Sequence, residues 1–346
     1  MDDKKGLSRK EFLNGIGLGL VGLTVGGLLG GTASGGEAPV VPAQPAPGRS
    51  PLPFSFAQRG RHPVKTEKLG GIAYDHENHL TIARGEGIEV LNVDRGGADP
   101  AGATLRLIKT SGPACAVAVD PEGNIYAAQR TRIEKFDPQG TRTAAWGEKG
   151  DGPGQFRFIT GLAASSSEVF ICDSGARKIH RFAADGDFID EMTGYNIPQG
   201  NPACGPIDPE PTEKGFLIPS GYFDCALDAH GLLYVGHTGQ HRVERYDANG
   251  KLVGWWGKFG SLPEDFCGCC NPTNLAVFPD GRVATTEKGV PRLKVYDPAG
   301  KMLAFLGEES FPGNTAGMDL AIDSQGRIAL AEPIKKEIRF YELRKN

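Results

Sequence analysis

The sequence predicts an all-β protein, a six-bladed β-propeller built from four-stranded antiparallel blades. Three observations lead to this prediction. The 346 residues include 50 Gly and 25 Pro, which is typical of many short strands joined by tight turns. From residue 70 onward a strand-like motif recurs about every 45 residues, a period characteristic of propellers and solenoids. Within each repeat, apolar and polar residues alternate between turns that end in Gly.

Residues 1–34 are predicted to be an export signal rather than part of the fold. A polar head precedes an apolar, Gly-rich run that is too short for a comfortable membrane span. The segment Ser8 to Leu13 resembles the twin-arginine export motif, with Lys10 in place of the second arginine. We therefore expect a periplasmic or extracellular protein, exported by the twin-arginine or the Sec route, with no stable membrane span after signal cleavage. Residues 35–53, rich in Pro, Gly and Ala, are predicted to form a disordered linker.

The propeller is predicted to span residues 54–346, and each blade begins with a short inner strand. One equivalent inner-strand position is occupied in the six repeats by Gly71, Ala116, Gly161, Asp224, Asn274 and Asp319. An insertion at 194–223 lengthens the connection to the fourth repeat. The last repeat has only three strands, and residues 53–60 resemble the missing fourth one. This N-terminal strand is therefore predicted to complete the last blade and close the ring.

Two segments in the third repeat region resemble the NHL-repeat family. They read WGEKGDGPGQF (146–156) and DSGARKIHRF (173–182), and GLA lies between them. The resemblance covers roughly residues 54–346 and implies a six-bladed propeller. It implies no particular function, because propellers of one architecture carry many activities.

Three polar side chains occupy consecutive inner strands, which line the central channel of a propeller. Asp224, Asn274 and Asp319 offer carboxylate and amide oxygens, the ligands that Ca²⁺ prefers. The arrangement is similar to the channel site of gluconolactonase-like and paraoxonase-like propellers. A water-filled channel is the alternative interpretation.

The ends of the second strands provide a further set of candidates. Six residues are predicted to line the mouth of the channel, and two of them are cysteines. They are Asp173, His237, Glu287, Glu332, Cys172 and Cys204. Asp173 is also expected to organise the turn that follows it. A three-histidine zinc site is not expected, because His76, His79 and His230 are predicted to lie in turns at the opposite face.

Seven cysteines are predicted to lie on one face of the disc. Cys267, Cys269 and Cys270 belong to a short insertion before the fifth inner strand. Two interpretations stay open. Disulfides are typical of exported proteins, although an odd number leaves at least one thiol unpaired. Alternatively the three thiols bind an iron–sulfur cluster, copper or zinc, with Cys225 or Cys115 as a fourth ligand. Their spacing matches no standard zinc or ferredoxin pattern.

Three functions are compatible with these features, and whether the protein is an enzyme stays open. The first is an exported binding module whose Cys-rich site serves electron transfer or recognition of a protein or small-molecule partner. The second is a calcium-dependent hydrolase of the lactonase or esterase kind, and the third is a non-catalytic scaffold held by disulfides. A net charge of -4 with mixed signs gives no basic patch for nucleic acid. We expect a monomer.

Overall fold

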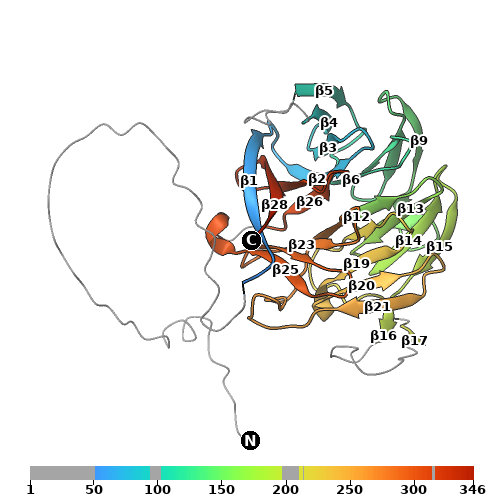
Figure 1. Cartoon of the computed structure of the whole chain (residues 1–346). Coiled ribbons are helices and arrows are strands. Elements are labelled where there is room, and N and C mark those ends of the chain that lie inside the picture. Colours follow the sequence, from blue (N-terminus) through green and yellow to red (C-terminus); the bar gives the residue numbers. More distant parts are fainter. Residues whose placement is uncertain (1–50, 94–102, 197–209, 213, 314–315) are drawn as a thin grey trace, which may run out of the picture. The chain divides into compact units, whose positions relative to one another are not determined.

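The computed structural model describes residues 51–93, 103–196, 210–212, 214–313 and 316–346. These residues form a six-bladed β-propeller, in which the inner strands of neighbouring blades contact one another around a closed ring (Figure 1). The fold class predicted from the sequence is therefore confirmed. The predicted export signal at 1–34 and nearly all of the predicted linker lie outside the described residues.

The first three blades follow the chain in order, each strand pairing with the next. The first contains β2 (Leu69–Tyr74), β3 (His79–Arg84), β4 (Gly87–Asn92) and β5 (Ala103–Ile108). The second contains β6 (Ala116–Val119), β7 (Ile125–Ala128), β8 (Ile133–Phe136) and β9 (Arg142–Trp146). The third contains β12 (Ile159–Ala164), β13 (Glu168–Asp173), β14 (Lys178–Ala183) and β15 (Phe188–Met192).

The remaining blades repeat this pattern, and the last one is completed from the other end of the chain. The fourth contains β18 (Cys225–Leu227), β19 (Leu233–His237), β20 (Arg242–Tyr246) and β21 (Leu252–Trp256). The fifth contains β22 (Asn274–Val277), β23 (Val283–Glu287), β24 (Arg292–Tyr296) and β25 (Met302–Leu306). The sixth contains β26 (Asp319–Ile322), β27 (Ile328–Glu332), β28 (Glu337–Lys345) and β1 (Phe54–Pro63).

Closure of the ring by an N-terminal strand is also confirmed. Strand β1 pairs antiparallel with β28 over its whole length, from Phe54 opposite Lys345 to Pro63 opposite Glu337, with one irregularity near Gln58. The two strands lie side by side in Figure 1, one blue and one red. The backbone N–H of Asn346 donates to the carbonyl of Pro53 at 3.0 Å, so the pairing extends to the end of the chain.

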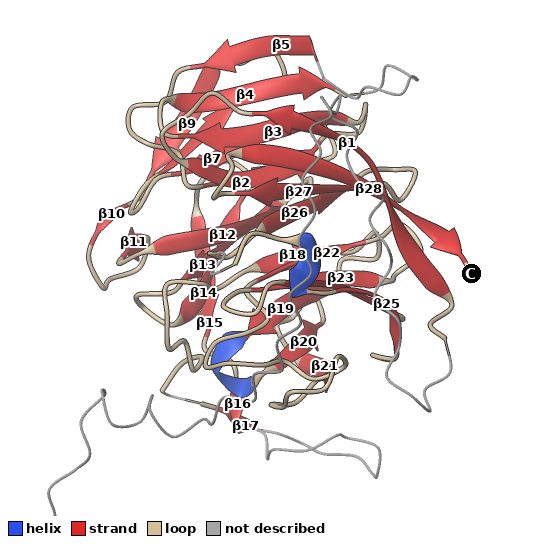
Figure 2. Ribbon diagram, turned by 90° about the vertical axis from the view of Figure 1, so that its left-hand side faces the viewer, coloured by secondary structure: helices blue, strands red, loops and turns tan. Residues whose placement is uncertain are grey.

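Short elements decorate the blades without changing their order. A parallel pair joins β10 (Glu148–Lys149) to β11 (Gln155–Phe156), and an antiparallel pair joins β16 (Tyr195–Asn196) to β17 (Glu210–Pro211). Two 3₁₀ turns, η1 (Thr238–Gln240) and η2 (Glu308–Ser310), are the helical segments seen in Figure 2. Among the described residues, no helix is long and apolar enough to cross a membrane.

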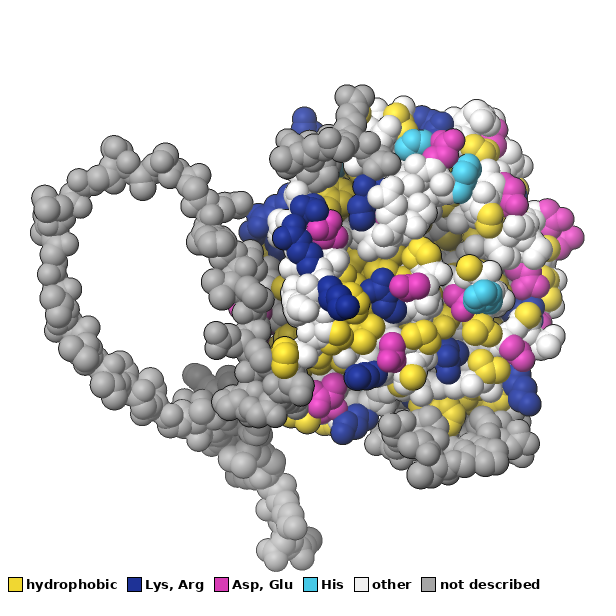
Figure 3. Space-filling view, viewed as in Figure 1, with side chains coloured by type: hydrophobic (Ala, Val, Ile, Leu, Met, Phe, Trp, Pro, Cys, Tyr) yellow, Lys and Arg dark blue, Asp and Glu magenta, His cyan; other side chains and the backbone are white. Residues whose placement is uncertain are grey.

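The repeated turns between strands have a common chemical basis. Asp120 Oδ1 accepts the backbone N–H groups of Glu122 at 3.1 Å and Asn124 at 2.8 Å, and Gly123 follows with a φ of +85° that favours glycine. Asp323 accepts two backbone N–H groups in the same way in the sixth blade. In these two repeats an Asp and a Gly therefore close the hairpin, and apolar side chains on both faces of the strands pack between blades. Charged groups of both signs are interspersed on the face shown in Figure 3.

Candidate functional site in the channel

The structure brings Asp224, Asn274 and Asp319 together on three neighbouring inner strands. The Nδ2 group of Asn274 donates to Asp319 Oδ1 at 3.1 Å. The strand pairing confirms that the three positions are equivalent. The carbonyl of Asp224 accepts the N–H of Gly236 at 3.0 Å, and Asn274 and Asp319 lie opposite the corresponding residues of β23 and β27.

Each carboxylate also reaches the inner strand of the following blade. Asp224 Oδ2 accepts the backbone N–H of Leu275 at 3.1 Å, and Asp319 Oδ2 accepts that of Ile72 at 2.7 Å. The two acids therefore connect blade four to blade five and blade six to blade one. Backbone donors satisfy one oxygen of each carboxylate. Of the other two oxygens, Asp319 Oδ1 accepts the Asn274 amide and Asp224 Oδ1 lies on the side of Gly161.

Small residues on the adjoining inner strands make room for these acids. A Cβ atom added to Gly161 would lie 2.4 Å from Asp224 Oδ1, and one added to Gly71 would lie 2.9 Å from Asp319 Oδ2. Both distances are shorter than side chains tolerate without a shift. The small residues of the first and third inner strands are therefore required by the acidic residues of the fourth and sixth.

The two carboxylates are in an environment that disfavours their charged forms. Burial, and next the neighbouring charge of Asp319, raise the pKa of Asp224 well above its usual range. Burial raises the pKa of Asp319 to about 6, against the opposing effect of its backbone hydrogen bonds. A positive ion between the carboxylates would offset both the desolvation and the mutual repulsion.

A cavity of about 200 Å³ adjoins the acidic cluster inside the channel. All six inner strands line it, and its walls beyond Asp224 and Asp319 consist mainly of small apolar residues such as Ala118, Ala163 and Ala276. The space suits a small ligand with few charges of its own.

The predicted mouth-lining role of the second-strand ends was wrong. Asp173, Cys172, Glu287 and Glu332 are completely buried, and His237 is 2% exposed. Their polar atoms turn toward backbone N–H groups of the adjoining loops instead of toward solvent. Asp173 accepts those of Arg157 at 2.7 Å and Ala176 at 2.8 Å, so its expected role in the following turn is confirmed. Cys204 lies outside the described residues.

The other members of this ring have the same structural task. Glu332 accepts the N–H of Ile334 at 2.8 Å, and His237 Nε2 accepts that of Leu217 at 2.9 Å. Glu287 accepts the N–H of Cys267 at 2.9 Å and forms a fully buried ion pair with Lys294 Nζ at 2.6 Å. A strand-end acid that contacts the backbone in this way holds a loop in place and is unavailable to a ligand.

The cysteines are divided among three places. Cys172 and Cys225 pack in one apolar cluster between the third and fourth blades. Cys115 Sγ lies 3.3 Å from the carbonyl of Ala128 and 3.6 Å from that of Ile159, between the second and third blades. The Sγ atoms of Cys269 and Cys270 lie 3.1 Å apart in the loop before β22, and all six described cysteines are free thiols.

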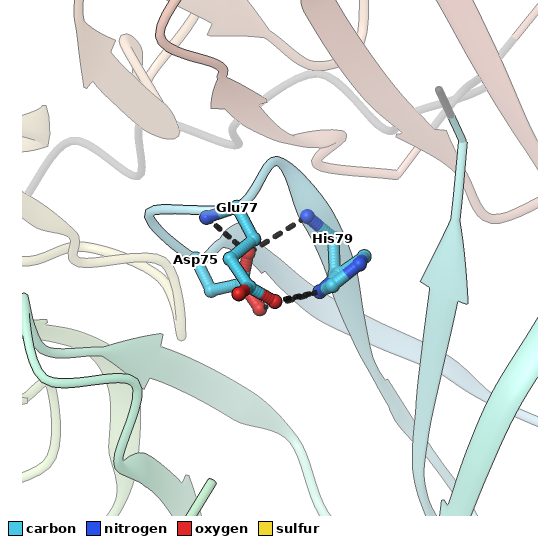
Figure 4. Close-up of side chains that lie close together, drawn as sticks. All are labelled: Asp75, Glu77 and His79. Atoms are coloured by element: carbon cyan, nitrogen blue, oxygen red, sulfur yellow. Dashed lines mark hydrogen bonds and ion pairs between the residues drawn. The ribbon is translucent and has the colours of Figure 1, made fainter. Parts of the chain in front are cut away.

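One group of potential metal ligands was not predicted. In the part of the chain that the structure describes, Asp75, Glu77 and His79 form the only set of three or more His, Cys, Asp or Glu side chains whose ligand atoms all lie within 4.8 Å of one another (Figure 4). Asp75 Oδ1 accepts the N–H groups of Glu77 and His79, and its Oδ2 lies 3.0 Å from His79 Nδ1. This is the hairpin geometry of Asp120 with a histidine added, and the sequence signal was the Asp-His-Glu-Asn-His turn.

The fold and the channel together define a six-bladed propeller with an acidic cluster on three neighbouring inner strands. No protein-family model matches the chain, and no curated protein sequence is similar to it. Its structure is similar to that of a streptogramin B lyase, with a TM-score of 0.53 and 13% identity over 84% of this chain and 98% of that one. It is also similar to a gluconolactonase from Xanthomonas campestris, with a TM-score of 0.54 and 15% identity over 82% and 88% of the two chains. At these identities the likeness shows the fold alone, and U3-55K, at 8% identity and a TM-score of 0.55, resembles the chain equally well.

Proposed function

We propose that this propeller binds a divalent cation such as Ca²⁺ in its channel and hydrolyses a small ester or lactone there. One observation carries the proposal: two carboxylates and an amide occupy three neighbouring inner strands, both carboxylates line a cavity of about 200 Å³, and the pKa values of both carboxylates are raised. Such a cluster is costly without a counter-charge, and hard cations prefer its oxygen ligands.

The residues present fit a cation of this kind. Asp224 Oδ1 and Asp319 Oδ1 are the oxygens that the backbone N–H groups of Leu275 and Ile72 do not occupy. The Asn274 side chain can present its oxygen in place of Nδ2 by a rotation of the amide. A bound cation would polarise a carbonyl group and lower the pKa of a bound water molecule. The volume of the cavity would select a small substrate.

The proposal is tested first by binding and then by turnover. Calcium added to chelator-treated protein should raise the Tm of the wild type, and Asp224→Asn and Asp319→Asn should abolish this rise. Asp187→Asn, which changes an exposed acid in an outer turn of blade three, is the matched control and should behave as the wild type. A panel of small lactones and aryl esters should then be hydrolysed only with the cation present. A Tm that changes with neither calcium nor chelator would refute the channel site.

A second candidate function rests on the thiols. The exposed side chain of Cys269 beside Cys270, in a loop that the repeat does not require, favours a binding module that recognises a partner or transfers electrons. We propose that this module acts after export to the periplasm or cell exterior and that Cys267, Cys269 and Cys270 bind a soft metal or an iron–sulfur cluster. Metal analysis and an optical spectrum of protein purified without oxygen test this candidate, and a colourless, metal-free product would exclude it.

A further inference from the structure

The loop Cys267–Asn271, between β21 and β22, holds two adjacent thiols of opposite accessibility. The Sγ atoms of Cys269 and Cys270 are 3.1 Å apart. Cys270 is 1% exposed, whereas Cys269 is exposed. We call this segment the thiol loop. A reagent in solution can therefore reach one sulfur of the pair and not the other.

The thiol loop is fixed to the neighbouring hairpin on both of its sides. Cys267 N–H donates to Glu287, whose other oxygen pairs with Lys294. The buried Asn271 side chain donates to the carbonyls of Cys267 at 2.6 Å and Lys288 at 3.1 Å, and it accepts the N–H of Lys288 at 3.0 Å. The sulfur atoms are thus held together by contacts that involve no sulfur.

The charges around the loop differ between the two sulfurs. The ammonium group of Lys288 and the hydroxyl of Ser220 are both hydrogen-bond partners of Cys270. Lys288 Nζ is placed over the ring of Tyr222, 4.7 Å from its centre. The polar groups around the loop therefore act mainly on the buried sulfur.

We propose that Cys269 and Cys270 form a reversible vicinal disulfide that exchanges with external thiols at Cys269. In the oxidised pair, an external thiolate attacks Cys269 Sγ, the bond between the two sulfurs breaks, and its electron pair leaves on Cys270 Sγ. A second external thiolate then attacks the external sulfur of the mixed disulfide and releases Cys269 as a thiolate. Two external thiols are oxidised to a disulfide, and the protein pair is reduced. The reverse reaction, with a low-molecular-weight disulfide as oxidant, regenerates the bond.

A general rule of thiol–disulfide exchange favours this direction of attack. The sulfur that a reagent can reach is the one attacked, and its bonded partner leaves. In this loop the accessible sulfur is Cys269, so Cys270 leaves, with the ammonium group of Lys288 beside it. A cation beside the leaving sulfur stabilises the reduced form, which makes such a pair an oxidant. The inference is independent of the channel site, whereas a metal bound by Cys269 and Cys270 would compete with the disulfide.

The experiment equilibrates the full chain in buffers of stepped reduced-to-oxidised glutathione ratio. Free thiols are then trapped by alkylation in acid and mapped by mass spectrometry. Cys269 and Cys270 should lose alkylation together, as a pair that has lost two hydrogens. In Cys270→Ser, Cys269 should instead accumulate a mixed disulfide with glutathione. Lys288→Met should favour the disulfide and move the midpoint ratio on the order of threefold, the effect of one partly exposed charge. Lys301→Met, in an exposed outer turn, is its control.

Two further variants separate the proposed pair from other arrangements. Cys267→Ser and Cys115→Ser should leave the oxidation of the pair unchanged, and both should retain the wild-type thermal unfolding curve. The proposal fails if both thiols are alkylated at every ratio, if the wild type also accumulates the mixed disulfide, or if Cys269 or Cys270 forms its bond with another cysteine.

Discussion

Removing the charge of Asp319 should change how the stability of the cation-free propeller depends on pH. The folded protein raises the pKa of Asp319 from 3.8 to about 6 because the side chain is buried. The folded state therefore binds this proton more tightly than the unfolded state, and the resulting stability is present below pH 4 and is lost as the pH rises through about 6. One pKa unit corresponds to about 1.4 kcal/mol, so the loss is on the order of 3 kcal/mol. Asp319→Asn carries no such proton and should not show this loss.

The measurement is urea unfolding followed by tryptophan fluorescence, in chelator, at several values between pH 4.5 and 7. The free energy of unfolding of the wild type should fall relative to that of Asp319→Asn as the pH rises, and calcium should restore it at pH 7. Asp187→Asn should keep the wild-type slope, because its carboxylate is exposed at an outer turn. Parallel curves for the wild type and Asp319→Asn would show that the channel does not disfavour the charge, and the electrostatic basis of the cation site would then be lost.

Three further predictions concern the scaffold. Lys294→Met leaves the buried carboxylate of Glu287 without its partner and should cost about 3–5 kcal/mol in urea unfolding, whereas the double change with Glu287→Leu should recover much of this. Burial opposes the charge of Glu244, yet His237 and Arg242 lower its pKa from 4.5 to about 2, so its contribution is present above pH 4.5 and is lost as the pH falls toward 2. Glu244→Gln should therefore lack about 3 kcal/mol of acid-sensitive stability, measured by acid unfolding at constant ionic strength. Deletion of residues 1–63 removes β1 and should give aggregates in size-exclusion chromatography, whereas deletion of residues 1–50 should leave the folded propeller.

The fold can be predicted from the sequence because the six repeats can be aligned with one another, and the alignment shows which positions are structurally equivalent. It identifies Asp224, Asn274 and Asp319 as equivalent from the sequence alone. The three-stranded last repeat likewise required a partner strand, which β1 provides. Both predictions need only the spacing of residues along the chain, and neither requires knowledge of side-chain conformation.

Side-chain direction could not be obtained in the same way. Glu287 and His237 lie at strand ends that should meet the mouth, but their polar groups turn to the backbone of the preceding loop. Whether such a side chain points to the mouth or to the loop backbone depends on the loop conformation, and the loops differ in length from blade to blade. The contact between Cys269 and Cys270 depends in the same way on a turn at Gly268, whose φ is +74°. Lys294 is the one residue that could have indicated this direction, because a buried lysine needs an acidic partner such as Glu287.

The pairing of β1 with β28 also affects how the chain acquires its structure. The two strands are separated by nearly the whole propeller, so blade six forms only after the other five have brought the ends together. Contacts of such long range are slow to form, and until they do, strand β28 presents an unpaired edge. A chain in which β28 has not yet been made cannot reach this state, however many blades it has completed. Under the proposed export, transport of a folded molecule would therefore have to wait for β28, whereas transport of an extended chain would leave ring closure to the far side of the membrane.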